Sequence, residues 1–91
     1  MTYKILIHEQ AERDLVQLAK NEPKAFQEAQ TLIEELRTHP KTGIGHPEPL
    51  KGKLEGRWSR RITAKHRLVY EVHDEEVIVF ILTACGHYDD K

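Results

Sequence analysis

The second half of the chain contains three kinds of side chain that could act together on a phosphodiester bond. They are a carboxylate in a loop, a group of arginines and lysines, and a histidine and a tyrosine near the C-terminus. Cleaving RNA without a metal needs a base for the ribose 2′-OH proton, cations for the charged phosphorane, and an acid for the departing 5′-oxygen. Histidine can serve as acid or base near neutral pH, and arginine offers phosphate oxygens a planar, permanently charged fork. Because most small proteins contain these residue types, composition alone shows only that the chemistry is compatible.

Metal chemistry is not expected from the sequence. The six histidines include no pair at i, i+4 spacing, and Cys85 is the only cysteine, so a Cys-x-x-Cys pair is absent. The glycines at 43 and 45 lack the spacing of a phosphate-binding P-loop. The sequence therefore predicts neither a metal nor another cofactor.

Positive charge is concentrated in one segment of a nearly neutral chain. Residues 51–67 contain seven of the fourteen Lys and Arg residues and one acid, a charge of +6, whereas the other 74 residues carry −7. Such a patch creates its own field over about 8–10 Å at physiological salt. Nucleic acid is the first expected partner and an acidic protein segment the second, with a merely solvated surface left open.

Size and composition predict one domain, residues 1–91. A chain with 38% hydrophobic and 32% charged residues is typical of globular proteins. The longest apolar run, residues 77–82, is far shorter than the roughly 20 residues that cross a membrane. The N-terminus lacks the features of a signal peptide, so a cytoplasmic protein without membrane partners is expected.

Hydrophobic periodicity predicts an α+β domain. Residues 3–7 indicate a strand, and two amphipathic helices follow, one around 11–19 and one that begins at Pro23 and stops before His39-Pro40. Residues 41–49 are expected to form an irregular loop. Three strands are predicted next, at 58–63, 67–73 and 76–84, and the last, apolar on both faces, is expected inside the sheet rather than at its edge.

Alternation along a strand separates neighbouring side chains. Arg60 and Arg61 should point to opposite faces, so at most one enters a given cleft, and Arg61 is the favoured one. Trp58 and Tyr70 are expected to pack rather than to stack on a base. The charged helix residues, Glu12, Arg13, Glu28, Glu34 and Glu35, are expected to face water.

An ordered set of motifs resembles the YoeB/Txe branch of the RelE superfamily of bacterial toxins. The motifs are PEPLK at 47–51, WSRRIT at 58–63, HRLVY at 66–70, and His87-Tyr88. They cover residues 43–88, while the first half agrees only in its strand-helix-helix order. The resemblance implies a RelE-like microbial ribonuclease fold, with two N-terminal helices on a mainly antiparallel sheet of four to five strands.

The resemblance also implies an activity and its partners. Members of this family are toxins of type II toxin–antitoxin systems, metal-independent endoribonucleases that cut mRNA in the ribosomal A site and so inhibit translation. The implied partners are the 70S ribosome, its mRNA and a cognate antitoxin of the YefM/Phd type, with a homodimer as a further assembly seen among relatives.

Carried over by position, the resemblance implies individual roles. Glu48 would be the general base, His87 the general acid, and Arg67 the group that binds the scissile phosphate. Lys51 and Arg61 would support Arg67, and Tyr88 would orient the substrate.

Two alternatives stay open on the sequence. The same scaffold could bind RNA or the ribosome without cleaving, or its basic cleft could serve only to hold an acidic antitoxin peptide. Replacing Glu48 and His87 separates an enzyme from a binder, because only an enzyme should lose an activity while it keeps its affinity.

Overall fold

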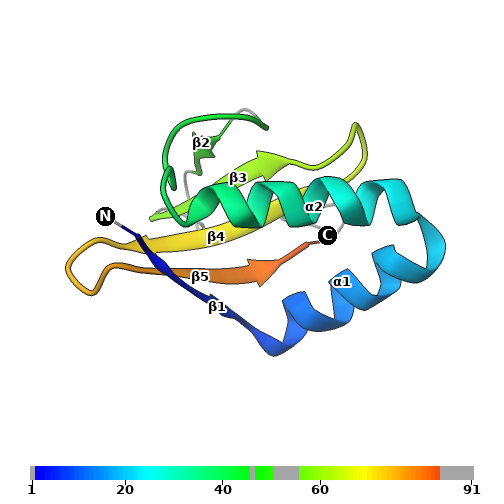
Figure 1. Ribbon diagram of the computed structural model, residues 1–91, viewed down its shortest axis with the longest axis horizontal. Helices are drawn as coiled ribbons and strands as arrows, with labels where there is room; N and C mark the ends of the chain where they lie inside the picture. The colour runs from blue at the N-terminus through cyan, green and yellow to red at the C-terminus, as the bar shows by residue number, and fades with distance from the viewer. Residues whose placement is uncertain (1, 46, 51–55, 85–91) are drawn as a thin grey trace.

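The computed structural model describes residues 2–45, 47–50 and 56–84. In chain order these residues form β1 (Lys4–Ile7), α1 (Glu9–Asn21), α2 (Pro23–Leu36), β2 (Glu48–Pro49), β3 (Arg57–Arg61), β4 (Arg67–His73) and β5 (Ile78–Thr83). The strands of the described residues form one sheet in the order β1-β5-β4-β3-β2 (Figure 1). The α+β class predicted from the sequence is therefore confirmed.

The sheet is mixed, because β1 runs parallel to β5 while the other three strand pairs are antiparallel. The expectation of a mainly antiparallel sheet holds for those three pairs and misses the parallel one. β5 lies between β1 and β4, which confirms that this apolar strand belongs inside the sheet. The short strand β2 was not predicted. It forms at the sheet edge, where Pro49 costs no ladder hydrogen bond on the open side.

Both helices begin with recognisable local signals. The His8 side chain caps α1 by accepting a hydrogen bond from the Gln10 N–H at 3.1 Å, and Glu9 and Glu12 in the first turn complement the helix dipole. Pro23 begins α2 in the first turn, where its missing N–H has no intrahelical partner to lose. α1 thus begins at a side-chain cap, whereas α2 has no side-chain cap and begins at its proline.

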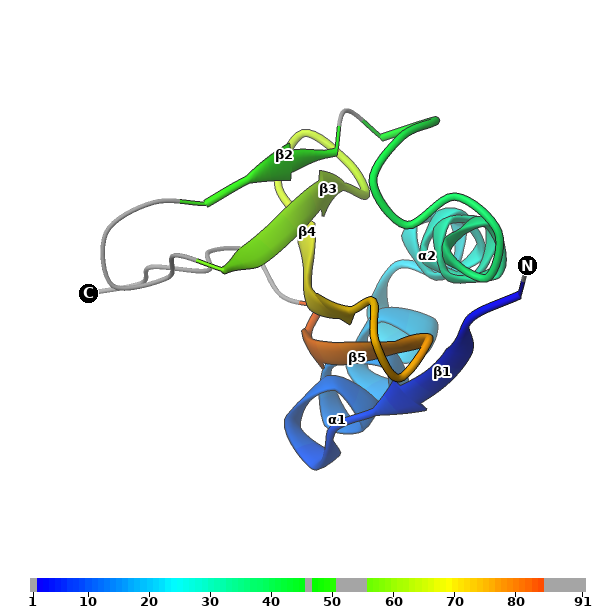
Figure 2. The ribbon, with the colours of Figure 1, turned by 90° about the vertical axis from the view of Figure 1, so that its left-hand side faces the viewer.

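The core lies between the helices and one face of the sheet. It contains buried residues of both helices (Ala11, Leu18, Ala25, Ala29, Leu32, Leu36) and of the strands (Leu68, Tyr70, Val79, Ile81). Trp58 packs against this core and Tyr70 is fully buried, so the prediction that both pack is confirmed. In Figure 2 the sheet curves around α2, and α1 lies beside β5. We call the helix-covered side the inner face and the opposite side the outer face.

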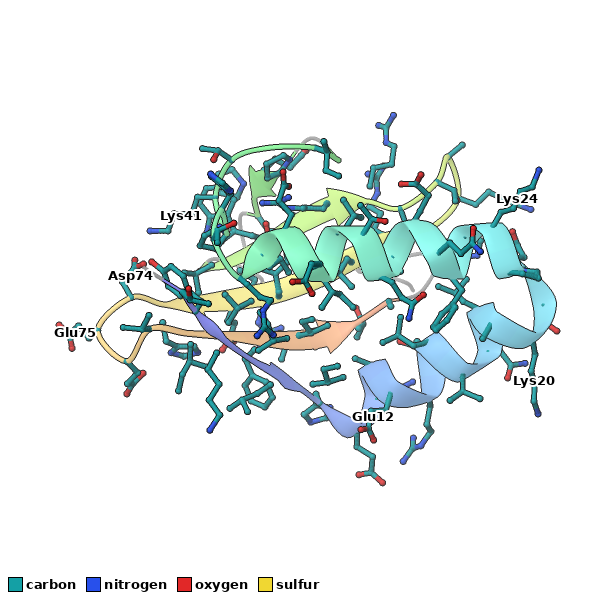
Figure 3. All side chains as sticks on the ribbon, in the orientation of Figure 1. Glu12, Lys20, Lys24, Lys41, Asp74 and Glu75 are labelled. Carbon is teal, nitrogen blue, oxygen red and sulfur yellow. The ribbon has the colours of Figure 1, made fainter. Side chains whose placement is uncertain are left out.

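Most charged helix residues face water as predicted. Glu12, Arg13, Glu28 and Glu34 are exposed, and Glu12 points away from α1 in Figure 3. Glu35 contradicts the prediction, because its side chain is only 25% exposed and forms an ion pair with Arg60. Within the described ranges, no helix has the length and apolar character required to cross a bilayer.

Candidate functional site

Strand register places Glu48, Arg61 and Arg67 on the outer face. Glu48 lies opposite Ser59 in the β2–β3 pair, Arg61 is two residues beyond Ser59, and Arg61 lies opposite Arg67 in the β3–β4 pair. Directly opposed residues of antiparallel strands share a face, and so do residues two apart on one strand. Three of the six predicted site residues are therefore brought onto one surface by backbone pairing alone.

The spacing of this surface suits a substrate that bridges it. Glu48 and Arg67 lie on strands two apart, and two residues of offset along the strand put their Cα atoms about 12 Å from each other. Between them lie Ser59 and Val69, which are only 2% and 3% exposed. A group held between β2 and β4 could meet a carboxylate from β2 and guanidinium groups from β3 and β4.

The side chains of Glu48, Arg61 and Arg67 have no hydrogen-bond or ion-pair partner among the described side chains. Arg57, on the same outer face, instead pairs with Glu71 at 3.2 Å between Nε and Oε2. The outer face of the described residues thus carries two arginines and one carboxylate that are not paired with one another or with other described side chains.

Arg60 takes the opposite position, on the inner face. It is fully buried, and its guanidinium contacts the Glu35 carboxylate, the Tyr70 hydroxyl and three backbone carbonyls. The prediction that Arg60 and Arg61 point to opposite faces is confirmed. The seven cations of the basic segment therefore do not form one patch.

Lys51, His87 and Tyr88 lie outside the described residues. The chain leaves β5 at Thr83, which pairs with Val69 near the beginning of β4, and the buried Ala84 follows. The sheet therefore delivers the chain to the end at which Arg61 and Arg67 stand.

A separate cavity of about 190 Å³ lies beside α1 and includes Asp14, Asn21, Glu22 and His66 in its lining. Its histidine is held by neighbours, with Nδ1 2.9 Å from the Thr63 hydroxyl and Nε2 3.5 Å from a Glu22 oxygen. Glu48 and the two outer-face arginines do not line it. Within the described residues, no cluster of three or more His, Cys, Asp or Glu side chains could hold a metal ion.

Fold and register describe a small α+β domain with two arginines and a carboxylate on the outer face of its sheet, and comparison with known proteins supplies the family. Residues 7–88 match the family model described as the YoeB-like toxin of bacterial type II toxin–antitoxin systems. The chain belongs to this family of toxins, which confirms the resemblance found in the motifs.

Individual relatives agree along nearly the whole chain. Toxin YoeB of Synechocystis is 40% identical over 85 residues, which cover 93% of this chain and 96% of that protein. The YoeB/ParE toxin from Agrobacterium tumefaciens, a solved structure, has a TM-score of 0.86 at 33% identity and covers 93% of this chain and 99% of its own. The YoeB dimer from Staphylococcus aureus has a TM-score of 0.81 at 35% identity, covering 97% and 100%.

Proposed function

We propose that this chain acts as a single toxin domain, residues 1–91, in the cytoplasm. Its activity is that of a ribosome-dependent, metal-independent endoribonuclease that cleaves mRNA in the ribosomal A site and so inhibits translation. The observation that carries the proposal is the common outer face of Glu48, Arg61 and Arg67 in a member of the YoeB-like toxin family. A general base and phosphate-binding cations are what this reaction requires from a protein surface.

The reaction proceeds by internal transfer at phosphorus. Glu48 removes the proton from a ribose 2′-OH, the 2′-oxygen bonds to phosphorus, and Arg67 with Arg61 stabilises the added charge of the phosphorane. The bond to the 5′-oxygen then breaks as His87 donates a proton to that oxygen. The products are a 2′,3′-cyclic phosphate and a free 5′-hydroxyl, without a hydrolytic water in this step. Lys51 assists with phosphate charge and Tyr88 orients the substrate.

Chain length supports the assignment of His87. It follows the buried Ala84 by three residues, and three residues span at most about 10 Å. Ala84 follows the strand end that pairs with β4 near Arg67. The chain between Ala84 and His87 is therefore short enough to keep His87 near the outer-face arginines.

The proposed partners are an antitoxin of the YefM/Phd type, the ribosome with its mRNA, and a second copy of the chain. YoeB from Staphylococcus aureus has been solved as a dimer and in a complex with YefM. We extend both assemblies to this chain. An acidic or apolar antitoxin segment that covers the outer face would keep mRNA from its two arginines.

The test is primer extension on a defined message in a purified translation system, with a known codon in the A site. The intact protein is compared with Glu48→Gln and His87→Ala, and Glu75→Gln serves as the matched control. Glu75 is an exposed carboxylate at the tip of the β4–β5 hairpin (Figure 3), whereas Glu48 lies on β2, level with Ser59 and Val69.

New 5′ ends at the A-site codon are expected only with ribosomes. They should fade in Glu48→Gln and His87→Ala and persist in Glu75→Gln. An intact message beside bound ribosomes would overturn the nuclease and leave a nonenzymatic ribosome binder. If the protein binds an antitoxin peptide and leaves translation undisturbed, the outer face serves only as a peptide-binding surface.

A further inference from the structure

Arg60 has an unusually complete set of partners for an arginine in a small protein. Its side chain is 0% exposed, and each of its five N–H donors has an acceptor. Nε donates to the Tyr70 hydroxyl at 3.1 Å, and the two terminal nitrogens donate to one carboxylate and three backbone carbonyls. A buried guanidinium is tolerated only when it is paired and hydrogen-bonded in this way.

Most of these acceptors belong to a single loop, residues 37–45. Arg60 donates to the carbonyl oxygens of His39, Thr42 and Ile44, the last two at 2.6 and 3.1 Å. The Tyr70 hydroxyl in turn donates to the Pro40 carbonyl at 2.9 Å. We call the side chains of Arg60, Tyr70 and Glu35 the loop clamp. Arg60 and Tyr70 donate to carbonyls along the loop, and Glu35, which pairs with Arg60, accepts a hydrogen bond from the Ile44 N–H at 3.1 Å.

The clamped loop leads directly to Glu48. The last carbonyl that the clamp holds is that of Ile44, and the next residue, Gly45, accepts a hydrogen bond from the Arg61 N–H at 2.7 Å. Gly45 has a φ of +82°, and a Cβ there would approach a Leu32 methyl carbon to 2.9 Å. The loop therefore reaches β3 at a position that needs glycine, three residues before Glu48.

Strand pairing alone gives Glu48 little support. β2 is two residues long and lies at the edge of the sheet, and β3 is its one neighbour among the described strands. The Glu48 side chain is exposed on the outer face and is not hydrogen-bonded to any described residue. Its position therefore depends on the backbone on both sides of it. Leu50 follows β2 with its N–H bonded to the Arg57 carbonyl at 2.8 Å, and the loop that the clamp holds precedes β2.

We propose that Arg60 is a positioning residue for Glu48: from the inner face of β3 it holds the loop that sets the general base on the outer face. This inference rests on the proposed function, which makes Glu48 the base. Arg60 itself is remote from the substrate because it is buried beneath the sheet. The two neighbouring arginines of β3 thus serve one site, Arg61 toward phosphate and Arg60 through the loop.

The kinetic test uses a double-mutant cycle in the A-site cleavage assay. Arg60→Lys keeps the charge and loses the fork, and Arg37→Lys, an exposed arginine beyond α2, is the matched control. Arg60→Lys should lower the single-turnover cleavage rate about 10–100-fold, as expected for a misplaced base, while ribosome binding changes by less than about twofold. In a Glu48→Gln background the same change should cost less than about threefold, because no base remains to be positioned.

An equal loss of rate in both backgrounds would overturn the proposal, since a merely structural role does not depend on Glu48. An unchanged rate in Arg60→Lys would overturn it as well. Tyr70→Phe repeats the cycle with a smaller change, so the proposal stays testable even if Arg60→Lys does not fold.

Amide hydrogen exchange measures the clamp independently of any cleavage. In Arg60→Lys and Tyr70→Phe, exchange should rise in residues 41–48 and at the Arg61 N–H by about tenfold or more, and stay unchanged in the β4–β5 hairpin. Unchanged loop exchange would overturn the clamp. Faster loop exchange together with a wild-type protein that cuts no message would show that the clamp exists and that the proposed function fails.

Discussion

The two faces of β3 put identical residues to different uses. Arg60 is fully buried with every donor bonded, whereas Arg61, its neighbour, is exposed and has no side-chain partner among the described residues. The buried arginine is committed to the fold, and the exposed one is the arginine proposed to bind phosphate. A run of basic residues in a strand is therefore evidence for a polyanion site only for those residues that alternation places on the same exposed face.

The largest expected effect is the loss of stability on removing the buried charge. Arg60→Met leaves the Glu35 carboxylate and several loop carbonyls without their donor, so unfolding free energy should fall by about 3–5 kcal/mol. Arg61→Met, one residue away, should change it by less than about 0.5 kcal/mol. Urea denaturation of the two variants measures both values.

A compensating change sharpens this comparison. Glu35→Leu in the Arg60→Met background removes the unpaired acid and should restore part of the lost stability, because an apolar pair can replace a buried ion pair. Equal losses in Arg60→Met and Arg61→Met would show that the inner and outer faces do not differ as described.

The second largest effect is expected on the cleavage rate of an outer-face variant, with little change in its stability. Arg67→Ala removes the guanidinium proposed to hold the phosphorane, and single-turnover cleavage should drop about 10²–10³-fold. Unfolding free energy should change far less than in Arg60→Met, because Arg67 forms no ion pair with a described residue. Arg13→Ala, an exposed arginine paired with Glu9 on α1, is the control and should cleave normally. If Arg67→Ala lost as much stability as Arg60→Met, both arginines would have a structural role and the comparison would fail.

The elements of this fold were readable from the sequence because their signals are local. Residues 67–73 were predicted as a strand and form β4 with those bounds, and Pro23 begins α2 as expected. The parallel pairing of β1 with β5 was not predicted, since it depends on where the chain returns after two helices. β2 was missed because two residues, one of them a proline, are too few to show periodicity.

The candidate site was predictable to the extent that it depends on the alternation of side chains between the two faces of a strand. The opposite directions of Arg60 and Arg61 followed from the period of a strand, and the motifs pointed to Glu48, Arg61 and Arg67, which the register places on one face. The loop clamp was not predicted, because Glu35 has the same spacing as the solvent-facing acids of its helix. A signal did exist: an arginine on the inner face of a strand must find acceptors in the core.

A smaller effect is expected from the hydroxyl of the clamp. Tyr70→Phe leaves the Arg60 Nε and the Pro40 carbonyl without this partner, and unfolding free energy should fall by about 1–3 kcal/mol. Arg60 keeps its other four bonds, so the loss should be smaller than in Arg60→Met. Loss of the hydroxyl without a change in stability would remove Tyr70 from the clamp.

The pH dependence of stability, compared between wild type and Tyr70→Phe, also tests the burial of the Tyr70 hydroxyl. Burial raises the pKa of the Tyr70 hydroxyl above its ordinary value, and Arg60 opposes the shift. A raised folded pKa stabilises the protein fully below the unfolded pKa of about 10, and that contribution is lost as pH rises through the folded value. The wild-type protein should lose more stability than Tyr70→Phe as the pH rises above about 10.

The smallest effect is expected where the loop is held at its exposed end. Lys41 and Tyr3 both contact Asp74, each at 2.7 Å, and Lys41 lies beside Asp74 in Figure 3. These hydrogen bonds, that from Lys41 first, lower the pKa of Asp74. A lowered folded pKa stabilises the protein above the unfolded pKa of about 3.9, and the contribution is lost as pH falls through the folded value.

Asp74→Asn should therefore lower the melting temperature slightly at neutral pH, by less than Tyr70→Phe, and the difference from wild type should shrink toward zero as the pH falls below about 4. Glu75→Gln, the adjacent exposed carboxylate, is the control and should match wild type throughout. If Asp74→Asn were as costly as Arg60→Met, the exposed contact would anchor the loop, and the buried arginine would no longer be what distinguishes the inner face of β3.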